Sequence, residues 1–262
     1  MVLKNMKKCN HEYDIIISCL AFTKNYSKLN RYRNIMLRKI PVLLYHNVAR
    51  ESADKWTITS EHFESILIYF KKYGFDTISC RELIDLRDTF VPKKVSIAFD
   101  DGHQGIYTEA FPLLKKYGFI ATIFLTTSFI NKCEDSFAGL TSGQIREMAD
   151  YGIEIGSHGV THVNLRKLSL QEQTMEIVNS KDFMENTFNI GINTFSYPHG
   201  CYDDNLKRII TRAGYTSAFS VFKGYSTRSF DQYAYDRLET SNCSHPLRGL
   251  EFRIKTNGYY LF

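Results

Sequence analysis

Two adjacent carboxylates, Asp100 and Asp101, are the first side chains in the sequence whose types and spacing suggest chemistry. They close the apolar run 95–99 and precede Gly102. Neighbouring side chains of a strand point in opposite directions, but a bend at Gly102, beyond the end of the strand, would let both carboxylates reach one cleft. Because two carboxylates so close together repel each other, a cation is expected beside them. The alternative is a common Asp-Asp-Gly turn without a function.

Two histidines four residues apart, His158 and His162, form the second group. They come directly after the apolar run 153–156. If a helical turn follows this run, the spacing places both imidazoles on one face. Two neutral imidazoles and one carboxylate form a three-ligand site with room for water, as in catalytic zinc sites. The alternative is one histidine that caps a helix and one that lies on the surface.

Both groups follow short apolar runs that alternate with amphipathic segments. Each amphipathic segment ends in glycine, which readily takes the left-handed conformation after a helix. Helices are expected before Gly74, Gly118, Gly152 and Gly214, and strands at 41–45, 95–99, 121–125, 153–156, 195–197 and 217–221. Strands that alternate with helices predict an α/β fold with a parallel sheet or barrel. Functional residues of such folds lie at the carboxyl ends of the strands.

Polar residues that can cap helices support these elements. Thr141 with Gln144 and Ser169 with Glu172 have the spacing of capping boxes, and Asp203 or Asp204 can cap the helix that contains Ile209 and Ile210. The pattern therefore places helices between the expected strands.

The composition is that of a globular protein, with 44% hydrophobic and 23% charged residues. A chain of 262 residues is long enough for one large α/β domain. We divide it into a basic N-terminal extension of unknown role, residues 1–39, and a catalytic domain, residues 40–262. The extension holds most of the excess behind the net charge of +5. No nucleic-acid-binding motif accompanies it, so no nucleic-acid partner is predicted.

Neither the cysteines nor the apolar runs indicate secretion or membrane insertion. Six cysteines are scattered without a Cys-x-x-Cys pair, which argues against a disulfide framework or a thiolate zinc site. The longest early apolar run, 15–20, is too short to span a bilayer, which needs about 20 residues. Glu12 and Asp14 precede it and no clear cleavage site follows. We predict no transmembrane segment and a cytoplasmic location.

Together the two chemical segments resemble the motifs of a known family. Ala98-Phe99-Asp100-Asp101-Gly102 resembles the Thr-Phe-Asp-Asp-Gly motif of the polysaccharide deacetylases, the NodB-homology enzymes of carbohydrate esterase family 4. Ser157-His158-Gly159-Val160-Thr161-His162 is similar to their His-(Ser/Thr)-x-x-His motif. Segments 41–46 and 111–118 also look like the family, and the resemblance covers about residues 40–222.

The resemblance implies a fold, a reaction and a set of roles. The fold would be a distorted (β/α) barrel of about seven parallel strands, and the substrate a carbohydrate with an N-acetylated amino sugar. Asp101, His158 and His162 would bind the metal, and Asp100 would be the general base. The metal would be a divalent ion, with Zn²⁺ favoured by the ligands and Co²⁺, Ni²⁺ or Fe²⁺ also suitable.

The third motif of the family matches the segment Phe195-Ser196-Tyr197-Pro198-His199-Gly200. The resemblance implies that the backbone N–H of His199 stabilises the oxyanion and that Pro198 and Gly200 shape the turn. His46, which follows an expected strand, and Tyr197, at the end of another, are predicted to bind substrate together with Pro198 and Gly200. For His46, a role in the core is the alternative. His199 itself is one candidate for the general acid.

The sequence departs from the family pattern at three places. Ser196 replaces the arginine that orients the base in the family, and Arg237 is a candidate substitute. The motif with a tryptophan is absent, since the single Trp56 comes far too early. The motif with the acid histidine is absent too, which leaves His245, His199 or Asp100 itself as proton donors. This abbreviated pattern is similar to the branch of the poly-N-acetylglucosamine deacetylases.

We therefore expect a metal-dependent hydrolase that removes N-acetyl groups from amino sugars of a polysaccharide or glycoconjugate. Two alternatives remain: a hydrolase of a non-sugar C–N amide on the same fold, and a degraded family member that binds glycan without turnover. A non-haem iron oxygenase also uses two histidines and a carboxylate. The βα pattern and the absence of His-x-Asp spacing disfavour that interpretation.

Overall fold

A computed structural model describes residues 40–51, 54–86, 93–134, 137–221 and 231–240. The predicted N-terminal extension, residues 1–39, and His245 lie outside the described residues.

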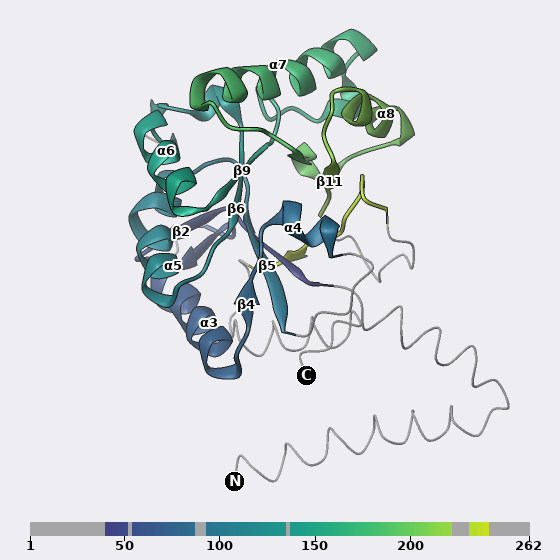
Figure 1. Ribbon diagram of the computed structural model, residues 1–262. Helices are drawn as coiled ribbons and strands as arrows, with labels where there is room; N and C mark the ends of the chain where they lie inside the picture. The colour runs from purple at the N-terminus through teal and green to yellow at the C-terminus, as the bar shows by residue number, and fades with distance from the viewer. Residues whose placement is uncertain (1–39, 52–53, 87–92, 135–136, 222–230, 241–262) are drawn as a thin grey trace, which may run out of the picture.

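A curled sheet of parallel strands forms the centre of the molecule (Figure 1). Its strands are β1 (Val42–Tyr45), β5 (Lys94–Phe99), β6 (Thr122–Leu125), β9 (Glu154–Ser157), β10 (Thr194–Ser196), β11 (Ser217–Phe219) and β12 (Leu238–Glu239). They follow the order β11-β10-β9-β6-β5-β1-β12, and the short strand β4 (Asp76–Thr77) pairs with β5. Each of the six strands expected from the sequence lies within two residues of its predicted bounds.

The two end strands of this sheet approach each other. Tyr235, three residues before β12, forms a parallel bridge with Phe219 of β11. Backbone hydrogen bonds from Ser220 to Tyr235 and from Tyr235 to Ala218 support the bridge. The sheet therefore closes into a distorted (β/α) barrel, and the predicted fold class is confirmed.

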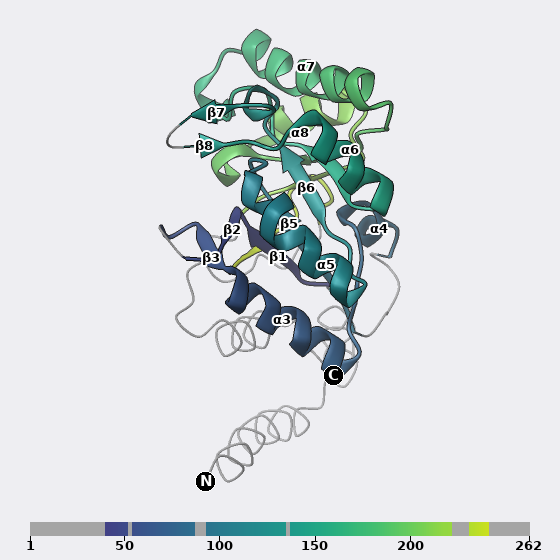
Figure 2. The same ribbon diagram turned by 90° about the vertical axis from the view of Figure 1, so that its left-hand side faces the viewer.

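Helices cover the outside of the sheet, as Figures 1 and 2 show. They are α3 (Ser60–Tyr73), α5 (Phe111–Tyr117), α6 (Ser142–Tyr151), α7 (Leu170–Phe188) and α8 (Asp204–Arg212). The π-helical turn Ile106–Ala110 leads into α5. Two small ribbons lie beside the barrel: β2 (Asn47–Ala49) with β3 (Thr57–Thr59), and β7 (Cys133–Glu134) with β8 (Phe137–Ala138). No helix of the described residues is long and apolar enough to cross a membrane.

The helix ends follow the sequence closely. Both predicted capping boxes are present, at the starts of α6 and α7, and Asp203 caps α8. Gly74, Gly118 and Gly152 end α3, α5 and α6 in the left-handed conformation. These caps satisfy backbone groups that a helix leaves unpaired at its ends.

Apolar side chains pack on both sides of the sheet, as expected for parallel strands. Leu43, Ile97 and Ile123 belong to the large cluster that also contains side chains of α3, α5, α6, α7 and α8. The neighbouring residues Val42 and Ala98 belong to a second cluster with α4 (Cys80–Asp85). This packing holds the strands in place and so fixes the positions of the loops at their carboxyl ends.

Candidate active site

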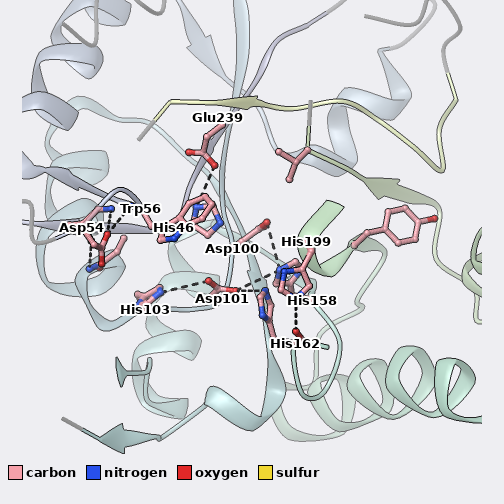
Figure 3. A pocket seen from close by; sticks show the side chains of 14 residues that line it. His46, Asp54, Trp56, Asp100, Asp101, His103, His158, His162, His199 and Glu239 are labelled. Carbon is pink, nitrogen blue, oxygen red and sulfur yellow. Dashed lines mark hydrogen bonds and ion pairs between the residues drawn. The ribbon is translucent and has the colours of Figure 1, made fainter. Parts of the chain in front are cut away.

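The predicted chemical residues meet at the carboxyl ends of β1, β5, β9 and β10. His46, the two aspartates and His158 follow the first three of these strands directly, and together they line a cavity of about 440 Å³. Tyr197, His162 and His199 line the same cavity. Figure 3 shows the residues that point into it.

Asp101, His158 and His162 face one another across a short gap. Asp101 Oδ1 lies 3.2 Å from His162 Nε2 and 3.6 Å from His158 Nε2. One ligand atom from each of the three side chains lies within 4.8 Å of the other two. The structure therefore brings together the three residues predicted to bind a metal.

The backbone reaches this arrangement without the helical turn that the sequence suggested. Residues 158–164 form no helix, and His162 has a φ of 60°. Asp101 has a φ of 73°, so the chain turns at Asp101 itself and not first at Gly102. Positive φ is unfavourable for residues with a side chain, at roughly 1 kcal/mol or more each. The expectation of a helical turn was wrong because a loop with left-handed residues aligns the imidazoles instead.

Glu176 of α7 holds this loop. Its Oε2 accepts hydrogen bonds from the backbone N–H groups of Val160 (2.8 Å) and Thr161 (3.0 Å), and its Oε1 accepts one from the hydroxyl of Thr161 (2.6 Å). Charge-assisted hydrogen bonds of this kind are stronger than neutral ones. Glu176 therefore stabilises the conformation that positions His162, and the sequence had not pointed to it.

We expect Glu176→Gln to weaken metal binding by roughly 10- to 100-fold, the range seen when residues that orient metal ligands are lost. The side-chain amide of Gln would place an N–H donor opposite the N–H and O–H donors of the loop. Zinc affinity, measured by competition with a chromogenic chelator, checks this. Glu172→Gln, on the same helix, is the matched control, because among the described residues the Glu172 carboxylate hydrogen-bonds to the cap residue Ser169 alone, and Gln also serves in capping boxes. Equal affinities for both variants would contradict a role of Glu176 at the site.

The protonation states suit a metal ion. His158 Nδ1 lies 2.8 Å from the carbonyl oxygen of Ser196, so Nδ1 carries the proton and the lone pair of Nε2 faces the gap between the three side chains. Burial, followed by the neighbouring His158, lowers the pKa of His162 to about 4, which keeps this ring neutral at pH 7. Burial opposes ionisation of Asp101, but His103 and the other imidazoles hold its pKa below the usual value.

These lone pairs converge on one point. Asp101 Oδ1 is buried and has no hydrogen-bond partner among the described residues. Two neutral imidazole nitrogens and a carboxylate oxygen at this spacing are a ligand set that Zn²⁺ and similar ions bind. The residues present therefore fit a divalent metal.

Asp100 is the second carboxylate of the site, and a buried arginine neutralises it. Arg237 Nη1 and Nη2 each lie 2.7 Å from one oxygen of Asp100. Ser196 donates to Asp100 Oδ2 at 3.2 Å and lies 2.8 Å from Arg237 Nη2. Burial opposes ionisation, but the charge of Arg237 lowers the pKa of Asp100. The structure thus places Arg237 where the sequence suggested it as a substitute cation.

The segment that contains Ser196 continues into a tight turn beside the metal ligands. His199 has a φ of 59°, and its ring centroid lies 4.7 Å from that of His162. Pro198 and Gly200 are buried in this turn, and a Cβ on Gly200 would lie 2.9 Å from Val221. Tyr197 is buried, and its hydroxyl donates to the carbonyl of Tyr233.

The opposite side of the cavity carries the predicted His46 together with Asp54, Trp56 and Glu239, which the sequence reasoning missed. His46 Nδ1 lies 3.7 Å from Glu239 Oε2, and the His46 ring lies 4.8 Å from the ring of Trp56. Asp54 lines the cavity as well. Figure 3 shows these residues on one side of Asp101, with His158 and His162 on the other. Glu239 ends a strand only two residues long, which gives no signal in the sequence.

Comparison with known proteins agrees with this geometry. A family model described as polysaccharide deacetylase matches residues 87–218. The chain belongs to the polysaccharide deacetylase family. Its membership confirms the predicted family and the predicted enzyme class, a hydrolase of carbon–nitrogen bonds other than peptide bonds.

Several members of the polysaccharide deacetylase family are similar over most of the chain. The protein YxkH of Bacillus subtilis (strain 168) is 33% identical over 206 residues, which are 78% of this chain and 72% of that protein. The poly-beta-1,6-N-acetyl-D-glucosamine N-deacetylase of Staphylococcus aureus (strain MRSA252) is 25% identical over 228 residues, 82% of this chain and 78% of the relative. The Streptococcus pyogenes deacetylase PplD, solved in complex with acetate, is 27% identical with a TM-score of 0.74. The match covers 81% of this chain and 97% of PplD.

Proposed function

We propose that the protein hydrolyses the N-acetyl amide of amino sugars in a polysaccharide, and that it does so with a divalent metal ion, Zn²⁺ being the best fit. One observation carries the proposal: Asp101, His158 and His162 present their lone pairs to one point of an open cavity, directly beside the ionised Asp100. The name of the Staphylococcus aureus relative supports N-acetylglucosamine as the sugar.

Asp101, His158 and His162 would hold the divalent ion, which would supply Lewis acidity toward the amide carbonyl and a lowered pKa of water at the site. Asp100 then acts as general base: its carboxylate is ionised at neutral pH and points into the cavity beside the ligands. Arg237 fixes both oxygens of Asp100 in position, so little reorganisation accompanies the proton transfer.

The turn after β10 faces the same point from the side of the imidazoles. The backbone N–H of His199 is the candidate donor to the developing oxyanion, and the left-handed conformation of His199 sets the direction of this N–H. Pro198 and Gly200 hold the turn, since both are buried.

The leaving amine needs a proton, and His46 is well placed to donate it. His46 lies across the cavity from His158 and has a carboxylate, Glu239, within 3.7 Å. His199 is less suited to this role because its Nε2 contacts the carbonyl oxygen of His162 at 3.2 Å.

Release of acetate tests the proposal. Protein loaded with Zn²⁺ or Co²⁺ is expected to release acetate from N-acetylglucosamine oligomers, and a chelator is expected to abolish the release until metal is added back. Monomeric N-acetylated sugars and simple non-sugar amides are assayed in parallel. Acetate from none of the sugars, with about one metal bound per chain, would favour the non-sugar amide or a glycan-binding protein. Failure to bind any metal would refute the site.

A further inference from the structure

Beyond His46, the wall of the cavity carries residues to which the proposed hydrolysis assigns no role. This wall ends in Trp56, the single tryptophan of the chain. Trp56 lines the cavity and lies beside His46, on the opposite side of Asp101 from His158 and His162 (Figure 3).

Trp56 is held in a defined position. Asp54 Oδ1 accepts hydrogen bonds from the backbone N–H groups of Trp56 (2.7 Å) and Thr57 (2.8 Å). Thr57 begins β3, which pairs with β2 directly after His46. Although burial opposes ionisation of Asp54, these hydrogen bonds lower its pKa, and a carboxylate at the cavity edge results.

The indole is nevertheless open to solvent. Trp56 is 45% exposed, whereas Tyr197 of the same cavity wall is fully buried. Lys55 Nζ lies 4.7 Å from the ring centroid, but a cation–π contact between exposed groups is weak and easily displaced. A large aromatic face held rigidly inside a cavity of ligand-binding size is typical of a binding surface.

We propose that Trp56 is the platform for a second amino sugar of the substrate, next to the sugar whose amide reaches the metal ligands. A pyranose ring has an apolar C–H face, which contacts the indole, and hydroxyl groups on its rim, for which Asp54 is an acceptor. The inference rests on the proposed function and adds the length of the substrate: the site takes an oligomer and not a single sugar.

Because Trp56 is the single tryptophan, its fluorescence reports on this subsite directly. The zinc-loaded Asp100→Asn variant of the full chain is titrated with an N-acetylglucosamine tetramer and with the monomer; metal-stripped wild type replaces it if the variant does not fold. We expect a saturable change in Trp56 emission with the tetramer at much lower concentration than with the monomer. Calorimetry on the same samples measures binding independently. Tetramer binding without a change in emission, or no tetramer binding at all, would overturn the proposal.

Kinetics separates the platform from the catalytic residues. For Trp56→Ala we expect the KM for the tetramer to rise about tenfold while kcat changes less than about twofold, the result of losing contacts made equally in ground and transition states. Tyr73→Ala is the matched control, because Tyr73 is 47% exposed and lies on α3 outside the cavity lining. Equal KM values for both variants would overturn the proposal.

The two proposals fail in different ways. If the wild type releases acetate but the emission of Trp56 does not change, the hydrolase function is supported and the Trp56 subsite is refuted. If the emission changes in a saturable way but no acetate is released, the Trp56 platform is supported and the hydrolase function is refuted. The protein would then bind glycan without hydrolysing it.

Discussion

The Asp100→Asn variant is expected to lose acetate release by roughly 100- to 10,000-fold, the usual contribution of a general base. Asn has the shape of Asp but cannot accept the proton. Asp100 is 2% exposed, and its oxygens are committed to Arg237 and Ser196 on one side of the cavity. Initial rates with saturating substrate and metal measure the effect.

The control for this variant is its metal content. Asp100 is not among the three residues that converge as ligands, so zinc affinity should change much less than the rate. His162→Ala is the opposite case: it should lose affinity for the metal together with the rate. An Asp100→Asn variant that retains more than about a tenth of the rate would exclude Asp100 as the base.

The Arg237→Met variant is expected to lose about 3–5 kcal/mol of folding stability, because it leaves a buried carboxylate without its partner. Arg237 is fully buried, and besides both oxygens of Asp100 it contacts the carbonyl oxygen of Ser220 through Nε at 3.0 Å. Denaturant unfolding measures the loss. Arg166→Met is the matched control: Arg166 is exposed and lies 3.7 Å from Asp203, and surface pairs contribute about 0–1 kcal/mol.

A double variant separates charge from packing. Asp100→Asn combined with Arg237→Met removes both charges, so its loss of stability should be smaller than the sum of the two single losses. If the two losses of stability are strictly additive, Asp100 and Arg237 do not stabilise each other.

The same pair sets a pH dependence. Arg237 lowers the pKa of Asp100 below its usual value of 3.8 despite burial. The stability that the pair contributes is therefore present above pH 3.8 and is lost as pH falls through the lowered pKa. In Arg237→Met, burial acts alone and raises this pKa, so the acidic limb of kcat/KM should move to higher pH.

The sequence predicted the parts of the site that lie in short segments. The adjacent aspartates and the two histidines each follow a strand, and the alternation of strands and helices places those strand ends at one edge of the sheet. Conversely, the conformation between His158 and His162 depends on the contact with Glu176 of α7. A local pattern contains no information on such a contact.

Long-range partners were the hardest to predict. Arg237 lies 137 residues from Asp100 in sequence, and the pairing of β12 with β1 brings them together. The sequence could propose Arg237 only as a candidate substitute for the arginine that Ser196 replaces. No role was predicted for Trp56 from the sequence because its position matches no family motif. The pairing of β2 with β3 nevertheless places Trp56 at the cavity. Sequence order and spatial order differ most at these positions.

The closure of the barrel by its last described segment has a consequence for the order of assembly. The three metal ligands lie between β5 and β10, whereas Arg237 and Glu239 arrive only when β12 joins β1. During synthesis or refolding of the chain, the three metal ligands can therefore come together before Asp100 is paired with Arg237. We expect zinc uptake to precede recovery of activity during refolding, which stopped-flow mixing with a zinc indicator can resolve. Hydrolytic competence would then mark the pairing of β12 with β1.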